Sequence, residues 1–373
     1  MKKFLLLAIT TVAAMTAVAG NSPYIAHVYD YLPAPGQFVN VYPAYQPGYT
    51  KADILAQLET TLVGKTNATV SLGSYGGYIV FGFDHPVVNR HGYDVKVYGN
   101  AIQSEAVSNM PGGSCEPGII MVGLDMDDDG VPSEGDKWYE IKGADYDRSQ
   151  HGYEITYYKP DENKVRVPHE SWRFITDVNY VYWTSNDQVA DSTSGYVWRN
   201  SFHNSNPYWP LWIEDTVLTF RGTKLPNTAI DMSGGNGNNW FQPFLGEGYV
   251  DNLPNPQEPG FKIDWAIDED GNPVMLDHID FVKVYTGQMY YCGWLGETST
   301  EVAGAEDLHP DALPLLVGDV NGDQQLNVTD VTLLISYVLG SSAVAIDEYA
   351  ADFNGDGNIN VTDVTALINK VLN

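Results

Sequence analysis

Two stretches near the C-terminus carry the same pattern, DVNGDQQLNVTD at residues 319–330 and DFNGDGNINVTD at residues 352–363. Each places oxygen-bearing groups at loop positions 1, 3, 5, 7, 9 and 12, with the backbone carbonyl serving at position 7. A cation of calcium size takes six to eight oxygen ligands, and a twelve-residue loop supplies them at this spacing. The pattern therefore predicts two calcium loops. The expected ligands are Asp319, Asn321, Asp323, Gln325, Asn327 and Asp330, then Asp352, Asn354, Asp356, Asn358, Asn360 and Asp363.

Apolar residues after each loop recur at the i, i+3, i+4, i+7 spacing of one helix face. They are Val331, Leu334, Ile335 and Val338 in the first copy, and Val364, Leu367, Ile368 and Val371 in the second. Pro310, Pro314 and Gly318 argue against a helix that enters the first loop. Each unit is therefore expected to be a calcium loop followed by one amphipathic helix.

The tandem repeat, the missing entering helix and Asp rather than Glu at position 12 make residues 318–373 resemble a type I dockerin. The resemblance implies docking to a cohesin-type partner protein. In that family the partner-facing residues lie at loop positions 10 and 11, here Val328 with Thr329 and Val361 with Thr362. The alternative is a calcium-stabilised terminal cap without a partner, because a segment this short usually needs a metal or another staple to fold.

The first 19 residues have the pattern of a secretory signal peptide: Lys2 and Lys3, an apolar run, and Ala-Val-Ala at residues 17–19. No later run is apolar enough to cross a bilayer. We therefore expect an exported protein, extracellular, at the cell surface or periplasmic, without a transmembrane anchor. Without the two leader lysines, the 19 basic residues fall to 17 against 48 acidic ones, so the formal charge of −29 becomes −31. Nucleic acid and anionic lipid are poor partners for such a chain.

Residues 20–309 are expected to form a β domain, joined by a linker at residues 310–317 to the C-terminal module. Short alternating runs between turn residues predict strands, for example YIVFGF at 78–83, IIMVGL at 119–124 and FVKVY at 281–285. One helix is predicted at residues 51–62 from an apolar stripe. Many short strands and few helices favour a mainly β, jelly-roll-like sandwich.

Five phrases in this region carry a second resemblance. They are PAPGQFVN at 33–40, SLG at 71–73, GFDHPVVN at 82–89, YGNA at 98–101 and WLGE at 294–297. Together they are similar to a group of uncharacterised cell-surface proteins of gut anaerobic Gram-negative bacteria. The order of a Gly-rich strand, the FDHPVVN turn at 83–89 and a following aromatic strand also resembles galactose-binding jelly rolls, which implies a sandwich and, by analogy alone, a glycan ligand.

An acidic loop in the β domain repeats the calcium pattern between two predicted strands. Asp125, Asp127, Asp129 and Asp136 occupy positions 1, 3, 5 and 12, with Gly130 at position 6. This spacing predicts a third calcium ion. A plain acidic hairpin loop is the alternative.

Two cysteines, Cys115 and Cys292, are present, both in turn-rich contexts. Export makes a disulfide chemically possible. We therefore expect a bridge between them, with two free thiols as the alternative.

Aromatic residues gather in two loops of the β domain. Tyr208, Trp209 and Trp212 lie in a loop punctuated by proline, and Trp240 follows glycine and asparagine. Aromatic faces beside amides suit sugar rings, because C–H groups pack on the ring while hydroxyls bond to amides. These residues are the predicted ligand site, and the alternative is that the rings belong to the core.

A hydrolase would need two carboxylates across a cleft, or a nucleophile with a histidine partner. Glu116, Glu140, Glu297 and Asp84 with His85 are candidate acids, yet no spacing singles out a pair, so no catalytic residue is predicted. The expected function is a glycan-binding protein tethered through a dockerin. A glycan-active hydrolase and a capture protein for a corrinoid or another small nutrient remain alternatives.

Overall fold

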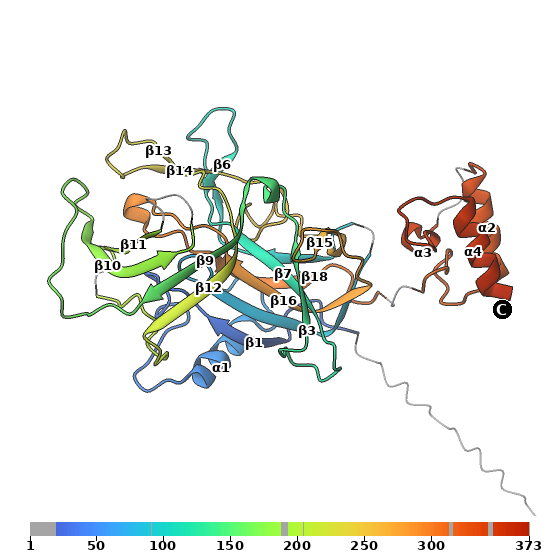
Figure 1. The fold of residues 1–373 in the computed structure, drawn as a ribbon, viewed down its shortest axis with the longest axis horizontal. Helices are drawn as coiled ribbons and strands as arrows, with labels where there is room; N and C mark the ends of the chain where they lie inside the picture. Colours follow the sequence, from blue (N-terminus) through green and yellow to red (C-terminus); the bar gives the residue numbers. More distant parts are fainter. Residues whose placement is uncertain are drawn as a thin grey trace, which may run out of the picture.

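The computed structural model describes residues 20–90, 92–187, 193–203, 205–312, 316–341 and 346–372. The predicted signal peptide lies outside these residues. Strands dominate the chain up to Asp307, whereas the C-terminal segment is helical (Figure 1). The predicted mainly β class with a small helical module at the C-terminus is confirmed.

A six-stranded antiparallel sheet lies at the centre of the β domain. Its order is β1 (His27–Leu32), β3 (Tyr78–Val88), β16 (His278–Thr286), β7 (Gly118–Leu124), β8 (Lys137–Ile141) and β15 (Ala266–Ile267). β16 lies between β3 and β7, so that Val282 pairs with Phe81 on one side and Val122 on the other. Strands distant in sequence are thus neighbours in space (Figure 1).

A second antiparallel sheet contributes the other wall of an aromatic core. Its order is β11 (Ser194–Asn200), β10 (Ile175–Ser185), β9 (Gln150–Tyr158) and β12 (Val217–Lys224). Tyr153 and Tyr157 of β9 join Tyr285 of β16 and Tyr75 in one buried cluster. The rings of Tyr75 and Tyr153 meet edge to face at 5.0 Å. Burial of side chains between two sheets is the arrangement that a sandwich requires.

Helix α1 (Lys51–Leu62) forms where the sequence predicts it. Thr50 caps it in a capping box with Asp53, which satisfies backbone donors of the first turn. Ile54, Leu58 and Leu62 are fully buried and belong to the same cluster as apolar residues of the six-stranded sheet. The helix therefore covers an apolar surface that would otherwise face solvent.

Short ladders position the segments between the main strands. A four-stranded sheet has the order β13 (Ile230–Asp231), β14 (Trp240–Pro243), β6 (Gly112–Ser114) and β5 (Ile102–Gln103). Two-stranded ladders join β17 (Glu301–Val302) to β2 (Val70–Ser71), and β18 (Gly304–Asp307) to β4 (Val95–Tyr98). Three 3₁₀ turns complete the described elements of this part: η1 (Tyr146–Arg148), η3 (Ile263–Trp265) and η4 (Gly293–Leu295).

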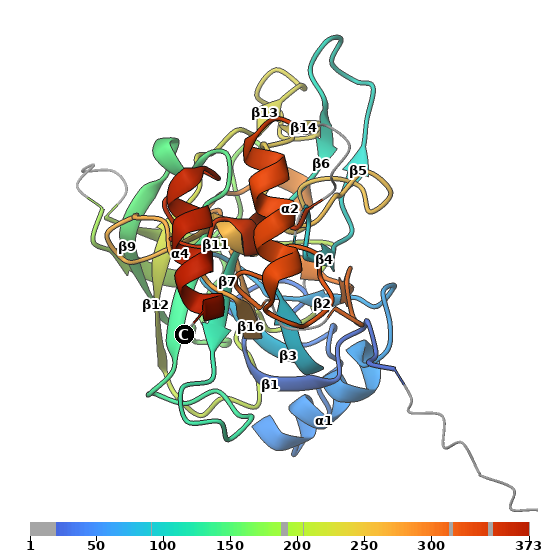
Figure 2. The same ribbon diagram turned by 90° about the vertical axis from the view of Figure 1, so that its right-hand side faces the viewer.

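The C-terminal module contains α2 (Val328–Val338), the short α3 (Glu348–Ala351) and α4 (Val361–Leu372). α2 and α4 lie side by side (Figure 2). Leu334 and Leu367 are fully buried in a small core with Val320 and Ala351. No helix among the described residues is long and apolar enough to span a lipid bilayer.

Candidate functional site

The first C-terminal loop folds its acidic side chains inward. The carboxylate of Asp319 accepts hydrogen bonds from the backbone N–H of Asp323 at 3.0 Å and of Gln324 at 2.6 Å. Asp330 accepts from Asn321 N at 3.3 Å and from Asn327 N at 2.9 Å, and its side chain is fully buried. The loop backbone therefore holds these carboxylates around one space.

The second loop repeats the first almost bond for bond. Asp352 accepts from the N–H of Asp356 at 3.1 Å and of Gly357 at 2.7 Å. Asp363, also fully buried, accepts from Asn354 N at 3.2 Å and from Asn360 N at 2.9 Å. The periodicity of the sequence is thus a periodicity of structure.

The donor set of both loops fits calcium. Among the residues that the structure describes, no lysine or arginine forms an ion pair with Asp319, Asp330 or Asp363. Buried carboxylates without a cationic partner are costly, and a bound divalent cation compensates for this cost. Carboxylate, amide and carbonyl oxygens at the six predicted positions are the hard ligands that calcium prefers.

The predicted partner-facing residues are exposed at the start of each helix. Val328 and Val361 each have 65% of their surface exposed. The two threonines differ: the hydroxyl of Thr362 accepts from Asn354 Nδ2 at 2.8 Å and donates to Asn360 Oδ1 at 3.0 Å. The predicted partner-facing residues of the two repeats are therefore alike in their exposed valines. They differ at the threonine, because the Thr362 hydroxyl is hydrogen-bonded to its own loop.

The acidic loop between β7 and β8 brings together three of its four predicted ligands. Oxygens of Asp125, Asp127 and Asp136 lie within 4.8 Å of one another. Asp129 instead accepts a hydrogen bond from Val131 N at 2.8 Å. Calcium binding at this loop stays a prediction.

The predicted aromatic platform is wrong for three of its four residues. Tyr208, Trp209 and Trp212 are 0%, 1% and 8% exposed and belong to the core. Trp212 stacks on Tyr31 at 6.0 Å, because its loop turns inward against the sheet. Trp240 is partly buried and donates from Nε1 to the carbonyl of Gly237 at 3.1 Å.

The predicted disulfide is also wrong in this structure, where both thiols are free and buried. The Sγ atom of Cys115 lies 3.5 Å from the carbonyl oxygen of Gln242 and 3.7 Å from that of Pro243. Burial raises the pKa of the Cys115 thiol, and likewise that of Cys292. Neither thiol therefore has the exposure and low pKa that a reactive cysteine needs.

A cavity of about 440 Å³, called here the Glu116 cavity, has an aromatic rim. Phe202 and Trp294 are 64% and 39% exposed, and their rings meet edge to face at 5.8 Å. Tyr42 is 43% exposed and lies 6.0 Å from the ring of Phe38. These rim residues have the exposure that the predicted platform lacks.

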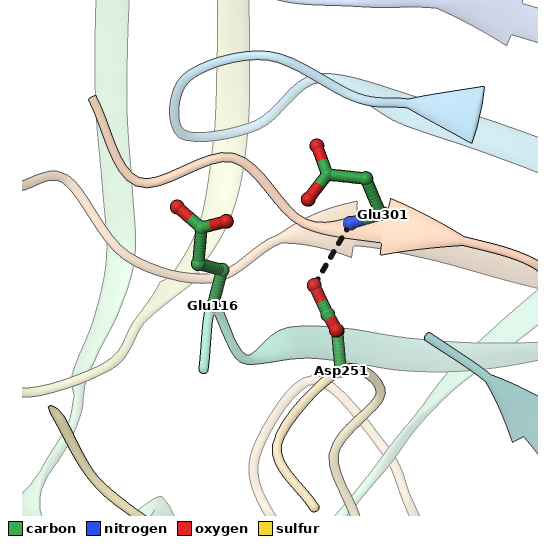
Figure 3. Close-up of side chains that lie close together, drawn as sticks. All are labelled: Glu116, Asp251 and Glu301. Atoms are coloured by element: carbon green, nitrogen blue, oxygen red, sulfur yellow. Dashed lines mark hydrogen bonds between the residues drawn. The ribbon is translucent and has the colours of Figure 1, made fainter. Parts of the chain in front are cut away.

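The floor of the Glu116 cavity is acidic. Glu116, Glu297 and Glu301 line it. Asp251 lies beside Glu116 and Glu301 (Figure 3). Burial raises the pKa of Glu116 to about 8, reinforced by the nearby charges of Asp251 and Glu297. Burial also raises the pKa of Glu297 to about 8 and that of Glu301 well above its usual range.

Two glycines leave room for the side chains of Asp251 and Glu297. A Cβ atom on Gly99 would lie 2.5 Å from Asp251 Oδ1, and one on Gly36 would lie 2.7 Å from Glu297 Oε1. Both glycines belong to phrases singled out in the sequence, PAPGQFVN and YGNA. Glu116 and Glu297 were among the candidate acids, whereas Asp251 and Glu301 were missed. Only the glycines beside the site could have indicated them.

A second cavity, of about 480 Å³, is lined chiefly by rings. Its aromatic residues are Tyr153, Trp172, Trp183, Tyr196, Trp198, Tyr290 and Tyr291. Glu297 borders both this cavity and the Glu116 cavity. The β domain thus has one acidic cavity and one aromatic cavity, and Glu297 lines both.

Comparison with known proteins bears on the C-terminal module. The family model described as "Dockerin type I domain" matches residues 317–372. Among solved structures, the chain is similar to a chain of the crystallised complex of CaCohA2 with a variant of CaDoc0917. The match has 38% identity, covers 16% of this chain and 100% of that one, and has a TM-score of 0.16. No curated protein matches the chain. Residues 317–372, with their two repeated acidic loops and paired helices, are therefore a type I dockerin domain.

Proposed function

We propose that this protein presents a carbohydrate-binding β domain on a cohesin-type partner, to which its dockerin domain attaches in a calcium-dependent manner. The family match supports the docking half of this proposal. The exposed Val328 and Val361 at the starts of α2 and α4 offer an apolar contact surface on each helix. We place the docked protein outside the cytoplasm, as the predicted signal peptide implies.

The observation that carries the carbohydrate proposal is an exposed aromatic rim over an acceptor-rich floor in the Glu116 cavity. Sugar C–H groups pack on rings such as Trp294 and Phe202. Sugar hydroxyls are donors, and the carboxyl oxygens of Glu116, Glu297 and Glu301, which line the same cavity, are acceptors. The combination of apolar wall and few convergent polar groups is typical of small-ligand sites.

A glycan screen against the full chain tests this proposal. We expect Trp294→Ala to reduce the affinity of any glycan found by about three- to tenfold, because an aromatic contact contributes roughly 0.5 to 1.5 kcal/mol. Tyr182→Ala is the matched control, since Tyr182 is 38% exposed and lies outside both cavities. Unchanged affinity in Trp294→Ala would remove the cavity from consideration.

Glycan hydrolysis is the second candidate function. Carboxyl oxygens of Glu116 and Glu301 lie within 4.8 Å of each other in the cavity, and retaining glycosidases hold two carboxyl groups about 5 to 5.5 Å apart. Release of reducing sugar, assayed beside the binding screen, distinguishes the two functions. Hydrolysis requires that Glu116→Gln abolish release.

Capture of a small nutrient such as a corrinoid is favoured by the second cavity, whose rings would cover a large planar ligand. Adding corrinoids to the screen tests it. Under this function, Trp198→Ala lowers corrinoid affinity, while Trp294→Ala leaves it unchanged.

A further inference from the structure

Three carboxyl groups from separate parts of the β domain converge beside the Glu116 cavity. Glu116 follows β6, Asp251 lies in the loop after β14, and Glu301 begins β17. One oxygen of each lies within 4.8 Å of the other two, and Figure 3 shows the three side chains grouped around a common space. Asp251 and Glu301 are only 1% and 5% exposed, whereas Glu116 is partly exposed and gives access from the cavity.

Neutral donors from the fold fix the three groups in place. Asp251 accepts from Asn100 N at 2.6 Å and from Glu301 N at 3.0 Å. Glu116 Oε1 accepts from Ser299 N at 3.0 Å, and Glu301 Oε1 accepts from Ser299 Oγ at 3.1 Å. Because each carboxylate oxygen has more than one lone pair, these bonds orient the groups without using all their capacity.

Positive charge is missing from this arrangement. Within the part of the chain that the structure describes, no lysine or arginine forms an ion pair with any of the three acids. Placing like charges together in a poorly solvated site is unfavourable unless protons or a cation neutralise them. Folding therefore brings together three acids that must be neutralised by protons or by a bound cation.

Two more oxygens of the same cavity lack partners, which is an independent observation. Glu297 Oε2 and Gln37 Oε1 accept no hydrogen bond in the described structure, although each side chain is only 4% exposed. Both residues line the cavity together with Glu116 and Glu301. A buried polar atom left unpaired costs free energy. Water, a hydrated cation or a donor-rich ligand in the cavity would satisfy both atoms.

We propose that Glu116, Asp251 and Glu301 bind one calcium ion at the base of the Glu116 cavity. Calcium lies 2.3 to 2.6 Å from its oxygen ligands, so oxygens on opposite sides of the ion are about 4.6 to 5.2 Å apart. A spread of at most 4.8 Å allows all three carboxyl oxygens to contact one such ion. Glu297 Oε2 and Gln37 Oε1 accept hydrogen bonds from water on that ion. The site does not depend on the carbohydrate proposal, because the ion is held by the protein alone.

Counting bound calcium on the full chain tests the site. Equilibrium dialysis with radioactive calcium, at increasing free calcium up to saturation, is compared between the wild type and Glu301→Gln. We expect the variant to bind one calcium fewer per chain. Glu306→Gln is the matched control: Glu306 lies in β18, close in sequence but bonded to Tyr98, and its variant should bind as many ions as the wild type. An equal count in the wild type and Glu301→Gln overturns the proposal.

A second variant and a second measurement guard against misfolding. Glu116→Gln changes the most accessible of the three acids and should also lose one calcium. Calcium should raise the melting temperature of the β domain more in the wild type and Glu306→Gln than in the two site variants, because all four proteins keep the Asp125 loop. If calcium raises the melting temperature equally in all four proteins, the ion is not at this site. If the wild type binds a glycan but has the same calcium count as the two site variants, the calcium site is wrong and the carbohydrate proposal still holds.

Discussion

The dockerin domain and the Glu116 cavity both bury carboxylates away from basic side chains, but they hold them in different ways. In the dockerin, Asp319 and Asp330 accept hydrogen bonds from N–H groups of their own twelve-residue loop. In the cavity, Asp251 accepts from Asn100, which lies 151 residues earlier in the chain. The first arrangement is local, whereas the second exists only after segments distant in the chain have come together.

This difference determines what each region needs in order to fold. The dockerin has a core of a few apolar residues around Leu334 and Leu367, which is small for independent stability. The β domain buries two large apolar clusters, and these supply a core that does not depend on the acids of the Glu116 cavity. We therefore expect calcium to decide whether the dockerin folds, and at most to adjust the stability of the β domain.

Calcium removal gives the largest expected effect. With chelator, α2 and α4 should lose all protection from hydrogen exchange, because metal binding supplies much of the folding free energy of such modules. β3 and β16 should remain protected in the same sample. Exchange measured by mass spectrometry on the full chain reports both regions at once. If α2 stays protected in chelator, the dockerin does not need calcium to fold and the expected difference between the two regions is wrong.

A truncation in the β-domain core should do the reverse. Trp209 is 1% exposed, so Trp209→Ala should destabilise the β domain by about 3 to 5 kcal/mol. The helices of the dockerin should keep their calcium-dependent transition. Thermal and urea unfolding, followed by tryptophan fluorescence, measure the loss.

Trp294→Ala is the matched control for this truncation. Trp294 is 39% exposed at the cavity rim, and surface substitutions usually change stability by about 0.5 kcal/mol or less. A loss as large as that of Trp209→Ala would show that the rim ring belongs to the core. The exposed aromatic wall of the cavity would then consist of Phe202 and Tyr42 without Trp294.

What could be predicted from the sequence follows the same division. The dockerin loops and the apolar stripes of α2 and α4 were predicted residue by residue, because their ligands and apolar residues recur at fixed local spacings. The short α3 was not predicted. α1 was predicted over the residues that form it, since its stripe and capping residues are also local. Local periodicity thus carried the strongest predictions.

The Glu116 cavity could not be predicted in this way. Its acids come from three segments whose meeting depends on sheet topology, and no spacing relates Glu116 to Asp251 or Glu301. The prediction that the loop of Trp209 forms an exposed ligand site failed for a related reason. An aromatic cluster in a turn-rich loop has the same composition whether the loop faces solvent or folds back on the core, and burial is a property of the whole fold.

The pH response should separate the two regions with a smaller effect. Burial raises the pKa of Glu140 to about 7, above its usual 4.5. Between these values the folded state binds more protons at Glu140 than the unfolded state does, so this group makes β-domain stability fall as pH rises, by up to about 1.4 kcal/mol per pH unit. Dockerin stability should instead rise with pH, because calcium ligands must be deprotonated.

Glu140→Gln isolates that response. The variant should be more stable than the wild type at pH 7 and should show a flatter dependence between pH 4.5 and 7, measured by urea unfolding of the β domain. Glu154→Gln, on the exposed side of β9, is the control and should follow the wild-type curve. A wild-type slope in Glu140→Gln would mean that other groups account for the pH dependence.

The smallest expected effect lies inside the dockerin, where the two repeats differ at one hydroxyl. Thr362 bonds to Asn354 and Asn360, both calcium ligands of the second loop by prediction. Thr362→Val removes these two hydrogen bonds and should weaken calcium binding at that loop by a few-fold, about 0.5 to 1 kcal/mol. Thr329→Val should leave calcium affinity at the first loop unchanged, while both variants weaken docking to a cohesin.

Calorimetric titration with calcium, and then with the partner, measures the two effects separately. Equal calcium affinities in Thr362→Val and the wild type would show that the hydroxyl serves partner recognition alone, and the two repeats would then be equivalent docking faces.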